Sequence, residues 1–135
     1  LQSILSEKDI AQYFLFPGWV KKDEKENLLK NADVFFLPSY TEAMPMSILE
    51  AMGYGLPIIT TNVGGIPKLV EEGKNGYMTE PGNIDGFVKA ILELISNDDL
   101  IYDMGKSSIE KASEKYSLEE HLRKVCTLYK NVCGE

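Results

Sequence analysis

The sequence is poor in cysteine and histidine and has no excess of positive charge. It contains two cysteines and one histidine among 135 residues, with neither a Cys-x-x-Cys pair nor a Cys/His cluster that would predict a zinc site. Acidic residues outnumber Lys and Arg by 21 to 14, which gives a formal net charge of −7. Proteins that hold nucleic acid or anionic lipid through their whole surface need the opposite balance, so nucleic acid is not an expected partner.

Long apolar runs are also absent. No segment approaches the roughly 18 apolar residues of a membrane-spanning helix, and there is no signal peptide. Cys126 and Cys133 lie in one predicted helix, about 10 Å apart along its axis and beyond disulfide reach, which favours a reducing compartment. The sequence begins at Leu1 without Met, and we expect it to be part of a longer protein.

Short apolar runs alternate with helical patterns over the first two thirds of the chain. Buried strands are expected at residues 13–16, 34–37 and 57–61, with a brief edge strand at residues 77–78. Continuously apolar strands that alternate with helices are typical of a parallel sheet covered on both faces. Three strands are fewer than a complete doubly wound sheet usually has. The sequence therefore predicts an α/β fold, the second half of such a domain with its C-terminal helices.

The predicted helices begin at recognisable signals. Asp23 with Glu26 starts one helix, Pro45 at a first helical position starts another that Gly53 ends, and a short helix follows near residues 67–70. Gly64 and Gly65 before that short helix favour a tight turn over an anion contact.

We treat residues 1–135 as a single, N-terminally truncated domain whose part from 82 to 135 is helical. Ser117 and Glu120 form a capping box that opens the last helix. The apolar residues of that helix repeat at spacings of four and three. They are Leu118, Leu122, Val125, Tyr129 and Val132. This pattern gives a narrow apolar seam suited to docking on a larger body.

The polar loop after the second strand leads directly into the helix that starts at Pro45. In open α/β sheets ligands bind beyond the carboxyl ends of the strands. The helix start presents free N–H groups near Met46 and Ser47, which suit a phosphate or diphosphate. Glu50 leans back toward this helix start, where it can accept hydrogen bonds from a ribose diol. Glu42 can do the same for a second polyol on the other side of the phosphates.

These residues describe a pocket for a nucleotide sugar, a polyol–diphosphate–polyol ligand. The alternative is that Glu42 is a solvated loop residue and Glu50 a surface helix residue. Spacing alone favours that alternative, because Glu72 and Glu80 have the same separation with no helix start between them.

Several motifs, in order and at matching intervals, resemble the family-4 retaining glycosyltransferases. The family's E-x7-E motif falls on Glu42 and Glu50, and residues 16–20 are similar to its F-x-G-x-V segment. Further matching segments are residues 32–39, 51–52, 55–59, 64–67 and 73–77. The resemblance covers nearly the whole chain. It implies a GT-B fold, in which two Rossmann-like domains face a cleft, and this chain is similar to the later part of the C-terminal, donor-binding domain.

The resemblance also implies roles for the residues. Glu42 would be the catalytic residue that contacts the transferring sugar, and Glu50 would bind the ribose. The remaining donor-binding residues would be Ala43, Met44, Pro45, Met46 and Ser47 around the sugar and phosphates, and Gly18, Trp19 and Val20 beside the base. Family members use a nucleotide-sugar donor, here UDP- or GDP-linked, with no cofactor and no metal ion, and they retain the anomeric configuration. The acceptor would be a glycan or a lipid-linked sugar.

The basic residues that stabilise the leaving diphosphate lie upstream of the matched region, as does the N-terminal acceptor domain. We therefore expect the 135-residue chain alone to be inactive and to need that missing acceptor domain as its partner. The usual work of the family, polysaccharide and glycolipid synthesis, implies a cytoplasmic enzyme with peripheral association at the inner face of the membrane. Ala43 and Pro45 replace glycines of the common motif, so the resemblance does not fix the identity of the donor. Lys68 replaces a glutamate and is expected to face solvent.

Two other interpretations stay open. A GT-B sugar-nucleotide epimerase would need a histidine near the donor site, and His121 lies in the last predicted helix instead. A non-catalytic, flavodoxin-like binding module would have no nucleotide affinity and no helix start open to a cleft. Trp19 either stacks on a base or is buried against the neighbouring helix.

Overall fold

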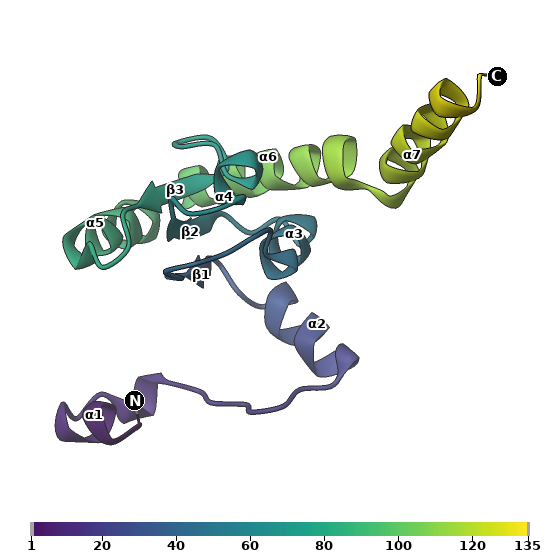
Figure 1. Ribbon diagram of the computed structural model, residues 1–135. Helices are drawn as coiled ribbons and strands as arrows, with labels where there is room; N and C mark the ends of the chain where they lie inside the picture. Colours follow the sequence, from purple (N-terminus) through teal and green to yellow (C-terminus); the bar gives the residue numbers. More distant parts are fainter. Residues whose placement is uncertain (1, 135) are drawn as a thin grey trace.

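The computed structural model describes residues 2–134, and Figure 1 shows the order of their helices and strands. The elements are α1 (Gln2–Glu7), η1 (Ala11–Tyr13), α2 (Lys22–Lys30), β1 (Phe35–Leu37), α3 (Met46–Gly53), β2 (Ile58–Thr61), α4 (Ile66–Leu69), β3 (Gly76–Thr79), α5 (Ile84–Ile95), α6 (Asp98–Tyr116) and α7 (Leu118–Cys133). Helices and strands alternate from α2 to α5, which confirms the predicted α/β class.

The strands form one parallel sheet in the order β1-β2-β3. Ile58 of β2 pairs with Phe35 of β1 on one side and with Gly76 of β3 on the other. Each connection between neighbouring strands passes through a helix, α3 and then α4, as parallel pairing requires. Every residue of the central strand β2 is buried. The predicted strands at residues 34–37, 57–61 and 77–78 are therefore confirmed as strands, but β1 is not buried as predicted, since Phe36 is exposed and its neighbours are half-buried.

The two faces of the sheet carry separate apolar clusters. Ile58 packs with α3 and α4 against residues such as Met52 and Leu69, whereas Ile59 packs with α5 and α6 against Phe87 and Leu94. Successive strand residues point to opposite faces, so this adjacent Ile pair anchors both layers.

Helix α6 fastens the amino ends of the strands. The Ser108 hydroxyl is buried and donates to the carbonyl of Leu56, which precedes β2, at 2.8 Å. Gly105 packs so closely on Gly55 that a Cβ at position 105 would overlap the Gly55 carbonyl. The opposite, carboxyl ends of the strands are left for the loops that hold the candidate site.

The predicted strand at residues 13–16 is wrong. Tyr13 ends η1, and Phe14 is extended, with φ −118° and ψ 127°, but it belongs to no strand. The Phe14 and Phe16 rings stack on each other, with centroids 6.4 Å apart, and both side chains are exposed. An apolar run becomes a strand only where another strand pairs with it, and among the described residues none does so here (Figure 1).

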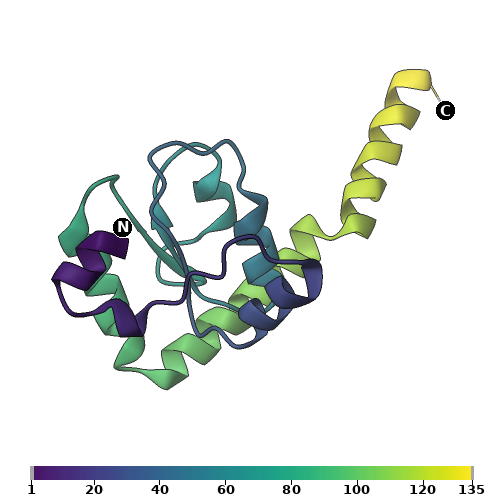
Figure 2. The same cartoon turned by 90° about the horizontal axis from the view of Figure 1, so that it is seen from below.

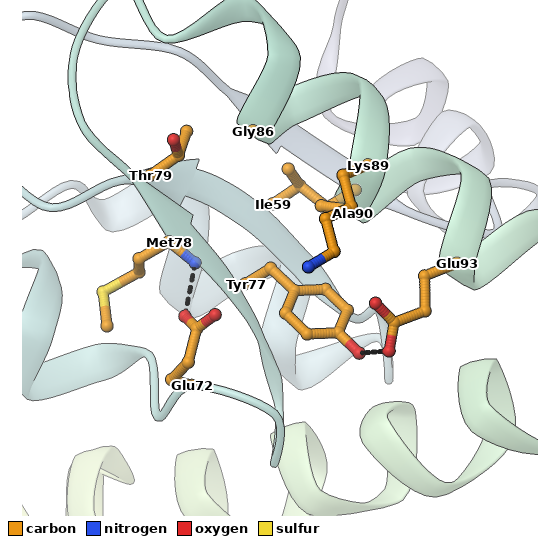
Figure 3. Close-up of a pocket in the computed structure, with 9 residues that line it drawn as sticks. All are labelled: Ile59, Glu72, Tyr77, Met78, Thr79, Gly86, Lys89, Ala90 and Glu93. Carbon is orange, nitrogen blue, oxygen red and sulfur yellow. Dashed lines mark hydrogen bonds between the residues drawn. The ribbon is translucent and has the colours of Figure 1, made fainter.

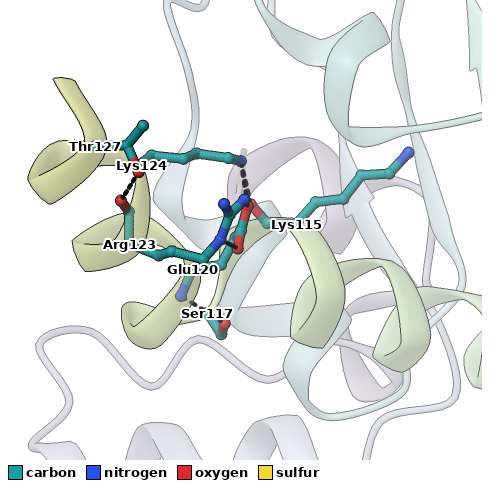
Figure 4. A network of polar contacts seen from close by, with 6 residues as sticks. All are labelled: Lys115, Ser117, Glu120, Arg123, Lys124 and Thr127. Atoms are coloured by element: carbon teal, nitrogen blue, oxygen red, sulfur yellow. Dashed lines mark hydrogen bonds and ion pairs between the residues drawn. The ribbon is translucent and has the colours of Figure 1, made fainter. Parts of the chain in front are cut away.

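Helix α7 begins at Ser117 as predicted, but only one half of the predicted capping box forms, and within residues 2–134 the helix packs on no larger body. The Ser117 hydroxyl accepts a hydrogen bond from the Glu120 N–H at 3.3 Å, and Glu120 binds Arg123 and Lys124 of the next turn (Figure 4). The helix extends away from the sheet (Figures 1 and 2), and none of its described residues is buried. The apolar seam therefore lies in solvent, without a body beneath it in this part of the chain.

Cys126 and Cys133 are both free and exposed on α7, in agreement with the prediction from their spacing. Within residues 2–134 no helix is both long enough and apolar enough to cross a membrane.

Candidate functional site

Two threonines fix the loop that leaves the carboxyl end of β1. The Thr60 hydroxyl donates to the Leu37 carbonyl at 2.9 Å, and the Thr61 hydroxyl donates to the Ser39 carbonyl at 2.5 Å. Both threonines are fully buried in β2, where a hydroxyl without a partner would be costly. These bonds hold the start of the loop against the sheet.

Gly64 and Gly65 hold the next part of this loop. A Cβ at Gly64 would overlap the carbonyl oxygen of Glu42, and one at Gly65 would overlap that of Ala43. Gly64 also has a φ of +55°, which favours glycine. The predicted tight turn is confirmed, and its backbone is the surface on which Glu42 and Ala43 rest.

Ser39 orients the Glu42 carboxylate. The Ser39 hydroxyl donates to Glu42 Oε1 at 2.8 Å, and both side chains are half-buried. Oε2 of Glu42 accepts no hydrogen bond from residues 2–134. One carboxylate oxygen is therefore fixed by the protein and the other is available to a ligand.

The start of α3 presents backbone donors without partners. Pro45 is the N-cap and not the first helical residue as predicted; its side chain is buried and offers no capping oxygen. In the described part of the chain, the N–H groups of Met46 and Ser47 donate no hydrogen bond, whereas that of Ile48 already bonds the Pro45 carbonyl. Two free donors at the positive end of a helix make an anion-binding position.

Glu50 lies on the following turn of α3 and is held from α2. Its Oε1 accepts a hydrogen bond from Lys25 Nζ at 2.7 Å, and both side chains are partly exposed. The Glu50 carboxylate raises the pKa of Lys25, chiefly through this hydrogen bond. Glu50 lies on α3 as the sequence predicts, whereas no local motif marks Lys25 as its partner.

The predicted base-side residues Gly18, Trp19 and Val20 lie in the segment before α2. Trp19 is fully exposed, so its burial against the neighbouring helix, one of the two interpretations, is wrong. Trp19 and Val20 line an open groove of about 560 Å³ along α2. The structure connects this segment to the start of α3 through α2, where Lys25 meets Glu50.

Lys68, the other departure from the family motif, is exposed on α4. Its carbonyl accepts a hydrogen bond from the Tyr116 hydroxyl at 2.8 Å. The expectation that this side chain faces solvent is confirmed.

A second hollow, of about 190 Å³, lies between β3 and α5 (Figure 3). Its polar groups bind one another: the Tyr77 hydroxyl donates to Glu93 at 2.7 Å, and Glu72 accepts from the Met78 N–H at 2.7 Å. Burial and the Glu93 carboxylate raise the pKa of Tyr77 to about 12. None of the loop and helix residues from Ser39 to Glu50 lines this hollow, so it is separate from the predicted site.

A paired lysine joins α6 to the turn before β3. Lys111 Nζ lies 2.7 Å from Glu71 and is largely buried, and Lys74 approaches the same carboxylate. Hydrogen bonds from these lysines, Lys111 first, lower the pKa of Glu71 to about 2. Among residues 2–134, no three or more His, Cys, Asp and Glu side chains are grouped as metal ligands.

The parallel sheet, with a helix start and two carboxylates at the carboxyl ends of its strands, defines a Rossmann-like α/β domain. The chain belongs to the family described as Glycosyl transferases group 1, whose model matches residues 1–123. It forms part of the C-terminal domain of the GT-B fold, as the resemblance implied.

Two curated relatives show this membership. The chain is 32% identical over 124 residues to the UDP-Gal:alpha-D-GlcNAc-diphosphoundecaprenol alpha-1,3-galactosyltransferase of Escherichia coli, covering 92% of this chain and 31% of that protein. It is 33% identical over 123 residues to the N-acetyl-alpha-D-glucosaminyl L-malate synthase of Bacillus anthracis, covering 91% of this chain and 32% of that protein. The chain thus spans about a third of the length of these relatives.

A solved structure shows the same fold. Anabaena Alr3699/HepE in complex with UDP superposes with a TM-score of 0.88 at 22% identity, covering 96% of this chain and 35% of that one. At this level of identity the likeness concerns the fold.

Proposed function

We propose that this chain forms the donor-binding part of a retaining glycosyltransferase. The whole enzyme moves a sugar from a nucleotide-sugar donor to a glycan or lipid-linked acceptor. One observation carries the proposal: the free N–H groups of Met46 and Ser47 lie at a helix start that Glu42 precedes and Glu50 follows. Family membership supports a transferase over a flavodoxin-like binding module.

The diphosphate of the donor binds at the start of α3, where the two free N–H groups and the helix dipole favour negative charge. Glu50 then accepts hydrogen bonds from the ribose hydroxyls, and the base lies beside Gly18, Trp19 and Val20. The donor is UDP- or GDP-linked. A UDP-sugar is supported by the name of the Escherichia coli relative and by the UDP complex of the Anabaena protein.

Glu42 serves the transferring sugar. Its carboxylate is bound by Ser39 at one oxygen and holds sugar hydroxyls through the oxygen left free. The bond from the anomeric carbon to the diphosphate breaks, and an acceptor hydroxyl forms the new bond on the same face and gives its proton to the departing diphosphate. The start of α3 stabilises the charge that develops on the leaving diphosphate, and we propose that no metal ion or cofactor is needed.

The remainder of the enzyme supplies the acceptor domain and the basic residues that complete the diphosphate site. We therefore propose that the 135-residue chain alone does not transfer sugar. A lipid-linked acceptor, as in the name of the Escherichia coli relative, would bring the whole enzyme to the cytoplasmic face of a membrane as a peripheral protein.

Calorimetry with UDP and GDP on the full-length protein tests the donor site. Replacing Glu50→Gln removes the charged acceptor and is expected to weaken binding of the preferred nucleotide about tenfold. Glu110→Gln is the control, because Glu110 is exposed on α6, the helix that packs at the amino ends of the strands. Equal affinity in the wild type and Glu50→Gln would exclude the ribose role of Glu50.

A further inference from the structure

Lys25 differs from the other lysines of α2 in the partner that it binds. Lys22 and Lys30 both approach Glu26 within the same helix, at 3.9 and 3.7 Å. Lys25 instead reaches across to α3 and donates to Glu50 at 2.7 Å. That separation is typical of a charge-assisted hydrogen bond, which is stronger than a loose surface ion pair.

The hydrogen bond from Lys25 occupies one carboxylate oxygen of Glu50 and leaves the other oxygen available to a ligand. Lys25 Nζ contacts Oε1, and within residues 2–134 Oε2 has no hydrogen-bond donor. The Ser39 hydroxyl holds Glu42 similarly, because it donates to Oε1 of that carboxylate and not to Oε2. Each of the two carboxylates is thus held by one protein donor, from the same loop for Glu42 and from α2 for Glu50, and keeps one oxygen for a ligand.

Without Lys25, the flexible side chain of Glu50 would sample several rotamers before a ligand bound. Ordering such a side chain on binding costs free energy, so a donor that orders it beforehand improves affinity. Lys25 also joins the start of α3 to α2, the helix that directly follows Gly18, Trp19 and Val20.

We propose that Lys25 is a positioning residue for the nucleotide, which fixes the Glu50 carboxylate for the ribose diol. The proposal rests on the proposed donor site. It extends that site to a residue outside the E-x7-E motif, and it makes recognition of the ribose hydroxyls depend on α2.

The test compares a nucleoside diphosphate with its 2′,3′-dideoxy analogue on the full-length protein. The preferred nucleotide of the calorimetry above serves as the probe. Lys25→Met is expected to weaken binding of the ribonucleotide about threefold to tenfold, with little change for the dideoxy analogue, because only the diol uses Glu50. Lys25→Arg keeps a hydrogen-bond donor and a positive charge, so it is expected to retain part of the preference for the ribonucleotide over the dideoxy analogue. Lys22→Met serves as the control, since Lys22 lies on the same helix and within residues 2–134 forms an ion pair with Glu26 alone.

The outcomes separate this proposal from the donor site itself. If Glu50→Gln lowers ribonucleotide affinity but Lys25→Met does not, or if Lys25→Met weakens both ligands equally, the positioning role is overturned while the donor site stands. If Glu50→Gln leaves ribonucleotide affinity unchanged, the ribose role of Glu50 fails, and the role of Lys25 fails with it. If Glu50→Gln and Lys25→Met both weaken binding of the ribonucleotide and leave binding of the dideoxy analogue nearly unchanged, the result supports both the donor site and the positioning role of Lys25.

Discussion

The carbonyl oxygen of Glu42 lies where a side chain on Gly64 would begin. The candidate catalytic carboxylate is therefore positioned by a turn that follows the neighbouring strand β2, and not by its own loop alone. Thr61 of that strand holds the same loop through the Ser39 carbonyl. The geometry around Glu42 thus depends on residues well beyond the E-x7-E motif.

Replacing Gly64→Ala is expected to displace the Glu42 loop. The added Cβ overlaps backbone, which cannot rotate away, and φ at this position is +55°. We expect the free energy of unfolding to fall by about 1–3 kcal/mol and the transfer rate of the full-length enzyme to fall at least about tenfold. Gly73→Ala has a similar φ of +71° with no atom within 4 Å, so it should lower stability and leave the rate nearly unchanged. Equal rates for the two variants would contradict the account.

Replacing Glu42→Gln is expected to separate transfer from binding. Loss of a carboxylate that contacts the transferring sugar lowers the rate of transfer, by about 100-fold if the carboxylate acts mainly in the transition state. The affinity of Glu42→Gln for the nucleoside diphosphate, which lacks the transferring sugar, should stay close to that of the wild type. Steady-state kinetics and calorimetry measure the two quantities. Thr41→Ala, an exposed neighbour in the same loop, is the control, and full activity in Glu42→Gln would remove this residue from the site.

Glu71 makes stability depend on pH. Its pKa is lowered from 4.5 to about 2 by Lys111 and Lys74, so the folded state favours the ionised carboxylate. The resulting stabilisation is fully present above about pH 4.5 and is lost as the pH falls toward 2. Because Glu71 is 40% exposed, solvent weakens the effect.

Unfolding in urea at pH 6 and at pH 3 checks this dependence. The difference in unfolding free energy between the wild type and Glu71→Gln should be smaller at pH 3. Glu110→Gln, at an exposed glutamate on α6, is the control for the loss of a surface carboxylate. A Glu71→Gln difference that does not change with pH would show that the ion pairs with Lys111 and Lys74 do not contribute.

Replacing Ser117→Ala is expected to loosen the start of α7. The Ser117 hydroxyl satisfies the Glu120 N–H, and an N-cap bond of this kind stabilises a helix by about 1 kcal/mol. Because none of the described residues of α7 is buried, little packing would compensate for the loss. Hydrogen exchange of the Glu120 amide should become about fivefold faster. Thr127→Ala removes a hydroxyl that bonds to Arg123 inside the same helix and should leave that exchange rate unchanged.

The sequence predicted the elements whose pattern is local. The β-branched run at residues 58–61 places Ile58 and Ile59 on opposite faces of the sheet, so its strand follows from the local pattern. The apolar run at residues 13–16 has no paired strand, and pairing is a non-local property that periodicity does not contain. The seam of α7 has the right spacing for docking, yet spacing does not say where the helix points.

The candidate site was predictable to a similar extent. The helix start and the two glutamates follow from sequence and motif, and the structure places them as expected on the loop after β1 and on α3. The contacts that hold them, Ser39 to Glu42 and Lys25 to Glu50, depend on rotamers and on the packing of α2 against α3. Gly64 was visible as a turn, but its role as the support for Glu42 becomes clear only in three dimensions.

A crystal structure of the full-length protein with its preferred nucleoside diphosphate tests the central claim most directly. We predict phosphate oxygens within hydrogen-bond distance of the Met46 and Ser47 N–H groups, and a ribose hydroxyl within the same distance of Glu50. A nucleotide bound elsewhere, for example in the hollow between β3 and α5, with the start of α3 unoccupied, would contradict the account.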